Sequence, residues 1–220
     1  MIIRITKWAV ALALAVSVGV GLAQAQNTFK YSFMVGSGFL CDSSDSPACP
    51  AMVKATQGDS YEISGAGTFD AQDKTVKGAG IFTHKSTNGS VLETGVWTVE
   101  NLLSFVSYGT APGALFRERN SFNAMRTDPR HLKIRMLSEP IPTGGLAVFR
   151  IQLLATSGGS RNAVLQVNCV LGDVPRERSI EGIRITLGRN SSEYSEEPSG
   201  RVMFLALRPE VSAPANMPEH

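Results

Sequence analysis

The sequence has few of the residues that build metal centres and catalytic nucleophiles. Its 220 residues include only three histidines and three cysteines. The histidines, His84, His131 and His220, are too far apart in the chain for a His-x-His or His-Glu-x-x-His metal motif. No serine stands in a Gly-x-Ser-x-Gly motif, which excludes the nucleophile elbow of an α/β-hydrolase. The sequence therefore predicts no metal and no cofactor, and it leaves catalytic residues unassigned.

The chain also lacks an excess of one charge. It carries 21 Lys and Arg against 19 Asp and Glu, and without Arg4 and Lys7 of its N-terminal segment the counts are 19 and 19. A formally neutral protein has no general attraction to nucleic acid or to an anionic membrane surface. We therefore expect no nucleic-acid partner, and a small molecule or a glycan is the partner class that remains.

Only one apolar run is long enough to suggest a targeting segment. Arg4 and Lys7 precede an uncharged run from Trp8 to Ala23, and Ala23-Gln24-Ala25 has the small residues of a signal-peptidase site. An uncleaved membrane anchor is the alternative, but the run is shorter than the roughly 20 apolar residues that a bilayer core requires. We expect residues 1–25 to be a signal peptide. The mature protein would then be exported, to the periplasm or the extracellular space, without integral membrane association.

The three cysteines make an odd number for an exported chain. Cys41 and Cys49 flank a short polar stretch whose closure into a loop costs little entropy, so they are the favoured disulfide pair. Cys169 lies in an alternating stretch whose apolar face would point its sulfur into the core. The alternative pairing joins Cys169 to Cys41 or Cys49, and it would constrain a far longer loop.

Segments that alternate apolar and polar residues recur along the chain, separated by Gly, Pro or Asn. The clearest are Tyr61–Phe69, Thr75–His84 and Val91–Val99, with a strong hairpin signal at Asn88-Gly89. Further strands are expected at Phe29–Val35, Leu132–Leu137, Leu146–Ala155, Ala163–Leu171, Ile183–Leu187 and Val202–Leu207. Short helices are possible only at Val99–Phe105 and Ala114–Met125.

This pattern predicts a single all-β domain over residues 26–208, followed by a proline-rich disordered tail at 209–220. The motif Gly-Ala-Gly-x-Phe occurs at 65–69 and again at 78–82, on strands that should be adjacent. Glycine inside a strand marks a bend, a bulge or the close approach of another backbone. Two neighbouring strands that bend at one level favour an antiparallel meander closing into a barrel, and a two-sheet β-sandwich is the alternative.

Aromatic residues gather between Gly95 and Gly109. Trp97 and Val99 share a strand face and are most simply part of the core. In a barrel, Trp97, Phe105 and Tyr108 would line a ligand cavity at its mouth. These three residues are the predicted cavity.

A local excess of positive charge lies between Arg117 and Arg135. On its last predicted strand Lys133 and Arg135 share a face, and with Arg130 they form a candidate anion-binding patch, because arginine presents a planar fork to oxyanions. A solvated strand face is the alternative interpretation.

His84 and two glutamates give further leads. Glu62 and Glu93 fall on strands two apart in the predicted meander, and paired acids across a concave face would suit glycoside hydrolysis. Outward-pointing carboxylates are the alternative. His84 directly precedes Lys85 and the Asn88-Gly89 turn, and it is interpreted as a solvated loop residue.

A wider resemblance rests on segments spread over most of the mature chain: Gly58–Thr68, Gly78–His84, Gly95–Thr98, Leu103–Phe105, Tyr108-Gly109, Leu165–Gly172 and Glu181–Arg184. In these segments the chain resembles a group of uncharacterised exported microbial all-β proteins with no known activity. The resemblance implies a coherent β domain and adds no catalytic residue.

Three functions from different classes remain. The leading one is an exported, non-catalytic, barrel-like binding domain for an unidentified ligand. The second is a barrel-type enzyme with a small cavity and no metal, which requires His84, His131 or Glu93 to open into a pocket with a shifted pKa. The third is a secreted structural or interaction protein, which should expose a large apolar patch instead.

Overall fold

The computed structural model describes residues 30–42, 48–110, 140–188 and 192–207, which form strands and short 3-10 helices. These elements are β1 (Lys30–Val35), η1 (Gly38–Asp42), β2 (Ala51–Ala55), β3 (Ser60–Asp70), β4 (Val76–Lys85), β5 (Val91–Thr110), β6 (Ile141–Ala155), β7 (Ser160–Cys169), η3 (Arg176–Arg178), β8 (Gly182–Leu187), β9 (Glu193–Ser199) and β10 (Val202–Leu207). The strands form one antiparallel sheet, which confirms the all-β prediction. Within the described ranges no helix is long and apolar enough to cross a bilayer.

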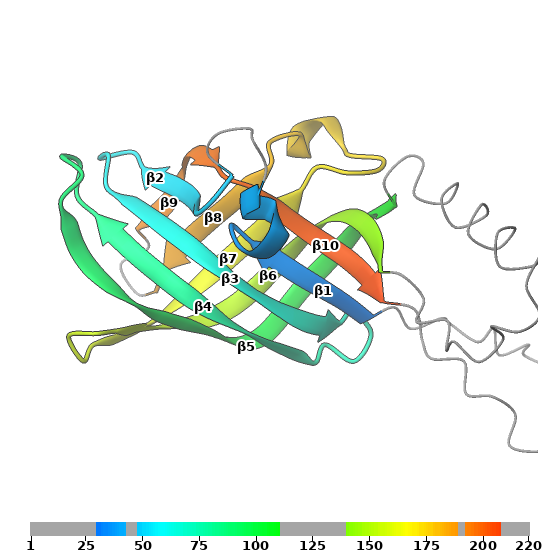
Figure 1. Ribbon diagram of the computed structural model, residues 1–220, viewed down its shortest axis with the longest axis horizontal. Helices are drawn as coiled ribbons and strands as arrows, with labels where there is room; N and C mark the ends of the chain where they lie inside the picture. Colours follow the sequence, from blue (N-terminus) through cyan, green and yellow to red (C-terminus); the bar gives the residue numbers. More distant parts are fainter. Residues whose placement is uncertain (1–29, 43–47, 111–139, 189–191, 208–220) are drawn as a thin grey trace, which may run out of the picture.

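The long strands β3, β4 and β5 form the predicted meander and lie side by side across the molecule (Figure 1). β3 pairs with β4 along one edge, and along the other edge with β2 at its start and β1 at its end. β6 similarly pairs with β5 along one edge, and with β10 and then β7 along the other. Two sets of strands therefore bridge β3 to β6.

The two bridges give the curled sheet two different ends. β1 and β10 complete a ring with β3, β4, β5 and β6, which we call the six-strand end. β2, β9, β8 and β7 bridge the same four strands at the other end, the eight-strand end. This second ring is partial, because β8 and β9 share only two residue pairs and the β2–β9 register is interrupted. The strands form one sheet, not a two-sheet sandwich, and full closure into a barrel stays a prediction.

The sequence located most strands but missed two and misassigned part of a third. β2 and β9 were not predicted, and Val99–Phe105, a possible short helix, is part of β5. Register shifts interrupt the β5–β6 pairing between Val99 and Asn101 and between Leu102 and Ser104. Each bulge breaks the period of two that identifies a strand. The predicted strand at 132–137, the possible helix at 114–125 and the predicted C-terminal tail lie outside the described residues, as does the predicted signal peptide.

Aromatic rings fill the six-strand end. Phe33 stacks on Phe149 with ring centroids 4.8 Å apart, and Tyr31 stacks on Phe69 at 5.1 Å. We call the set the aromatic core: Tyr31, Phe33, Phe69, Phe105, Phe149 and Phe204. Ring pairs at these distances add to the stabilisation from area burial.

Paired glycines make room for Trp97 and for Phe33 of the aromatic core. Gly65 lies opposite Gly80, and Gly67 opposite Gly78, in the β3–β4 register. A Cβ on Gly65 would clash with the Trp97 ring and lie 2.5 Å from the Ala79 carbonyl oxygen. The repeated Gly-Ala-Gly therefore marks places where inner side chains press directly against the sheet backbone.

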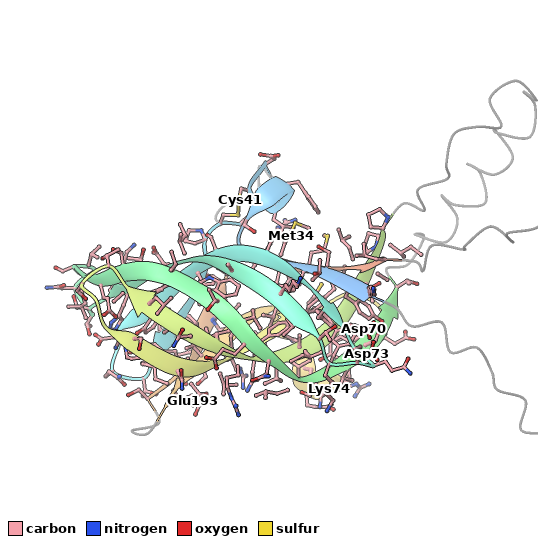
Figure 2. All side chains as sticks on the ribbon, turned by 90° about the horizontal axis from the view of Figure 1, so that it is seen from below. Met34, Cys41, Asp70, Asp73, Lys74 and Glu193 are labelled. Atoms are coloured by element: carbon pink, nitrogen blue, oxygen red, sulfur yellow. A yellow bond between two sulfur atoms is a disulfide. The ribbon has the colours of Figure 1, made fainter. Side chains whose placement is uncertain are left out.

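The disulfide prediction is confirmed. Cys41, on η1, is bonded to Cys49, with Cα atoms 5.3 Å apart, and Cys169 is a buried free thiol on β7. Figure 2 shows Cys41 outside the sheet, well away from the turn that follows β3 at Asp70. Burial raises the pKa of the Cys169 thiol to about 12, which makes it a poor nucleophile.

Candidate functional site

Polar side chains gather on the inner face of the sheet at the eight-strand end. They come from β3, β4, β5, β7, β9 and the turn before β3, and we call them the polar cluster: Asp59, Tyr61, His84, Glu93, Arg161 and Tyr194. Their inward direction follows from strand alternation. Tyr61 shares a face with Ile63, and His84 with Phe82, and both of these neighbours are core residues.

His84 is the centre of the polar cluster. Its ring stacks on Tyr61 with centroids 4.5 Å apart and an angle of 7° between the planes. Its Nε2 lies 3.3 Å from the Tyr194 hydroxyl and 3.8 Å from an Asp59 carboxylate oxygen. Burial lowers the pKa of His84, although Asp59 opposes the shift. The imidazole is therefore neutral at pH 7.

The interpretation of His84 as a solvated loop residue is wrong. β4 continues to Lys85, so His84 is still inside the strand, and its side chain is only 13% exposed. The nearby Asn88-Gly89 turn suggested an earlier strand end. The alternation Phe82, Thr83, His84 was the signal that placed His84 on the inner face.

Tyr61 is fully buried, and its hydroxyl has no hydrogen-bond partner among the described residues. Burial raises its pKa to about 12, against an opposing effect of the Arg161 guanidinium. A buried polar group without a partner costs about 1–3 kcal/mol. Glu93 Oε2 is also buried without a hydrogen-bond partner among the described residues, but it is ion-paired with Arg161. The Tyr61 hydroxyl has neither kind of partner within the described part of the chain.

Glu93 and Arg161 form an ion pair at the edge of the polar cluster. Glu93 lies directly opposite His84 in the β4–β5 register, and 17% of its side chain is exposed. Glu62 is on the outer face, where it accepts a hydrogen bond from Lys85. The predicted pairing of Glu62 with Glu93 is therefore wrong, because the two carboxylates lie on opposite faces of the sheet.

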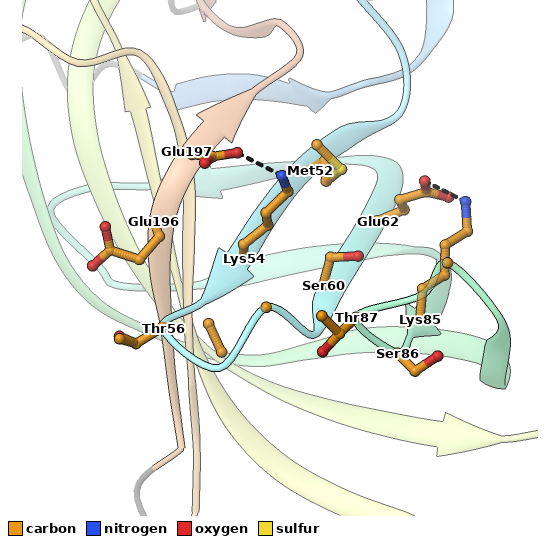
Figure 3. Close-up of a pocket in the computed structure, with 13 residues that line it drawn as sticks. Met52, Lys54, Thr56, Ser60, Glu62, Lys85, Ser86, Thr87, Glu196 and Glu197 are labelled. Atoms are coloured by element: carbon orange, nitrogen blue, oxygen red, sulfur yellow. Dashed lines mark hydrogen bonds and ion pairs between the residues drawn. The ribbon is translucent and has the colours of Figure 1, made fainter.

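A groove of about 610 Å³ lies on the outer face at the same end (Figure 3). Two ion pairs line it: Lys54 with Glu197 and Lys85 with Glu62, each at 2.5 Å. Ser60 lies between the two lysines.

Asp59 connects the polar cluster to this groove. One of its carboxylate oxygens accepts hydrogen bonds from the backbone N–H and the hydroxyl of Thr87, at 3.1 and 3.2 Å. Its other oxygen is the one near His84. Since Thr87 lines the groove, Asp59 contacts both His84 of the polar cluster and a residue of the groove.

The residues of the predicted cavity occupy other places. Trp97 has no exposed surface, and its Nε1 donates a hydrogen bond to the Ser64 carbonyl at 3.2 Å. Phe105 belongs to the aromatic core, and the buried Tyr108 donates to the side chain of Asn168 at 2.9 Å. None of the three lines the groove. The predicted cavity stays a prediction, and the space around Trp97 is filled by protein atoms.

Two predictions from the sequence remain: an exposed apolar patch and an anion-binding patch. Ile81, Val96 and Leu154 lie directly opposite one another on adjacent strands, and all three are exposed. This exposed apolar row is the observation relevant to the third function, that of a secreted structural or interaction protein. The candidate anion patch, Arg130, Lys133 and Arg135, and also His131, lie outside the described residues.

Within the described ranges, no three His, Cys, Asp or Glu side chains gather in a way that could hold a metal ion. Comparison of the chain with protein-family models, curated proteins and solved structures finds no match. The resemblance to uncharacterised exported proteins therefore stays a prediction.

Proposed function

We propose that the protein is an exported, non-catalytic binding domain that takes up a small ligand at the eight-strand end of its sheet. The observation that carries this proposal is the buried Tyr61 hydroxyl, which has no partner in an otherwise connected polar cluster. Buried polar groups in native proteins are nearly always hydrogen-bonded, and the exceptions concentrate at functional sites.

The surroundings of Tyr61 support a ligand at this end. Arg161 and Asp59 are the more exposed members of the polar cluster, with 43% and 28% of their side chains accessible, so they mark the edge from which a ligand would approach. A ligand that reached Tyr61 would supply the missing hydrogen bond and recover its cost. Among the described residues, the six-strand end offers no comparable group, because aromatic rings fill it.

The test is a search for bound material in the exported protein purified from its native source. Native mass spectrometry should show a small molecule, and the same compound should raise the melting temperature of ligand-free protein. At 100 times its dissociation constant, a ligand stabilises the folded state by about 2.7 kcal/mol. Tyr61→Phe should lower this stabilisation by about 0.5–1.5 kcal/mol, as expected for one hydrogen bond, while the protein remains folded.

Tyr108→Phe is the matched control. It also removes one buried tyrosine hydroxyl, but that hydroxyl bonds Asn168 and lies outside the polar cluster. Ligand stabilisation that is equal in both variants would place the ligand elsewhere. If no compound co-purifies and none stabilises the protein, the proposal fails.

A barrel-type enzyme is the second candidate, and the position of His84 favours it. A neutral imidazole next to the Tyr194 hydroxyl and opposite Glu93 can accept a proton near pH 7. Tyr194 and Asp59 both approach Nε2, so the arrangement differs from a Ser-His-Asp relay, which uses both ring nitrogens. An enzyme would convert its bound compound during incubation, and His84→Gln would stop conversion without preventing binding.

A further inference from the structure

The outer groove is built from residues in direct register on three strands. Lys54 of β2 lies opposite Ser60 of β3, and Ser60 lies opposite Lys85 of β4. Directly opposite residues of an antiparallel pair point to the same face, so the serine hydroxyl stands between two lysine side chains. Figure 3 shows this arrangement, with Thr87 and Ser86 on the turn beyond.

Ser60 differs from an ordinary surface serine in its burial and in its lack of a hydrogen-bond partner among the described residues. It is only 7% exposed, yet it lines the groove. Its hydroxyl makes no hydrogen bond to another described residue, whereas the Ser37 hydroxyl donates to a carbonyl at 2.6 Å and the Ser86 hydroxyl bonds Asn88 at 2.6 Å. The Ser60 hydroxyl, which can both donate and accept a hydrogen bond, is therefore available to a ligand at the base of the groove.

The charges of the groove are balanced in pairs. The Lys54 and Lys85 ammonium groups are each held by a glutamate, and Glu196 adds a further carboxylate to the lining. Two cations against three anions give no attraction for a negatively charged ligand. Each ion pair still offers free N–H donors and free oxygen acceptors at its edges.

We propose that this groove binds a neutral carbohydrate. Each sugar hydroxyl both donates and accepts, which matches a lining that alternates ammonium, carboxylate and hydroxyl groups: Lys54, Lys85, Glu62, Glu197, Ser60 and Thr87. Met52 adds an apolar surface for the C–H face of a ring. The volume falls within the range of about 300–1,000 Å³ that small-molecule sites occupy. This site is separate from the polar cluster and lies on the opposite face of the sheet.

The experiment is a titration of isotope-labelled protein followed by NMR. Cellobiose, maltose and N,N′-diacetylchitobiose are the neutral probes, and glucuronic acid is the anionic one. At least one neutral disaccharide should cause saturable shifts in the amide signals of Lys54, Ser60 and Lys85. Glucuronic acid should bind more weakly. Ser60→Ala should weaken the binding roughly three- to tenfold, as expected for one hydrogen bond.

Ser64→Ala is the matched control, since Ser64 is on the same strand with the same side-chain direction but does not line the groove. Equal effects of Ser60→Ala and Ser64→Ala would overturn the proposal, as would tighter binding of glucuronic acid or no saturable shift with any neutral probe. Tyr61→Phe should leave carbohydrate binding unchanged. The groove proposal and the ligand proposed for the polar cluster can therefore fail separately.

Discussion

At the six-strand end the interior holds stacked aromatic rings, whereas at the eight-strand end it holds two tyrosines, a histidine and three charged groups. β3, β4, β5 and β6 run through both ends. Along β3, for example, the inner face changes from Tyr61 to Gly67 and Phe69. The comparison shows that one sheet can carry apolar packing at one end of its inner face and polar groups at the other.

Trp97 lies between these two regions, beside Gly65 and Gly80. Trp97→Ala should lower the free energy of unfolding by about 3–5 kcal/mol, because it removes a fully buried ring and leaves a cavity. Urea unfolding followed by circular dichroism measures this loss. Trp8 lies in the predicted signal peptide, so the emission of protein that lacks residues 1–25 reports Trp97 alone and should be blue-shifted until the protein unfolds.

Val96→Ala is the control for this prediction. Val96 is the preceding residue on β5, but it points outward and is 47% exposed, so its truncation should cost less than about 0.5 kcal/mol. Equal losses for the two variants would mean that the inner face of β5 is assigned wrongly.

Gly65→Ala should have the next largest effect. Its Cβ would enter the space of the Trp97 ring and approach the carbonyl oxygen of Ala79. We expect a loss of about 1–3 kcal/mol from overpacking. Gly159→Ala, in the β6–β7 turn where no atom lies within 4 Å of the added carbon, should be near neutral in the same urea experiment. A neutral Gly65→Ala would show that the aromatic packing has room to adjust.

The strands could be predicted from the sequence where an alternating apolar and polar pattern ends at clear turn residues. Asn88-Gly89 and the regular period of β3 and β4 identified the meander correctly. β9 gave no such signal, since it contains successive glutamates and a left-handed residue, Glu197, with φ of 45°. Its pairing with β2 depends on contacts between distant segments, and local propensity carries no information about those.

The polar cluster was only partly accessible from the sequence. Alternation alone could have placed Tyr61 and His84 on the inner face, because each lies two residues from a buried hydrophobe. The contribution of Tyr194 could not be predicted, since it reaches His84 only through the bridge that β9 makes to β2 and β8. The groove could not be predicted either, because it depends on the same bridge, which brings Glu197 to Lys54.

The pH dependence of stability should distinguish two buried titratable groups, one inside the polar cluster and one outside it. Burial lowers the pKa of His84 in the folded state below its ordinary value of 6.5. Its stabilising contribution is therefore complete above pH 6.5 and is lost as the pH falls from there through the lower folded-state pKa. The free energy of unfolding should decrease from pH 7 to pH 5, and His84→Gln should reduce this slope.

Glu181, just before β8, should act with the opposite sign. Burial raises its pKa above the ordinary 4.5, so its contribution is complete below pH 4.5 and is lost as the pH rises through its folded-state value. Urea unfolding at several pH values, compared between wild type, His84→Gln and Glu181→Gln, resolves the two contributions. An unchanged slope in His84→Gln would contradict the burial assigned to this imidazole.

The smallest changes in the free energy of unfolding should come from the two tyrosines of the polar cluster. These changes test whether the two hydroxyl groups differ in their hydrogen bonding. Tyr194→Phe removes a hydroxyl that lies within hydrogen-bond distance of His84 and should cost about 0.5–1.5 kcal/mol. Tyr61→Phe removes a buried hydroxyl without a partner and should be neutral or stabilising by up to about 1 kcal/mol. Both variants keep the aromatic ring, so packing is conserved. If Tyr61→Phe instead costs as much as Tyr194→Phe, the Tyr61 hydroxyl is satisfied in the free protein, and the argument that it awaits a ligand is lost.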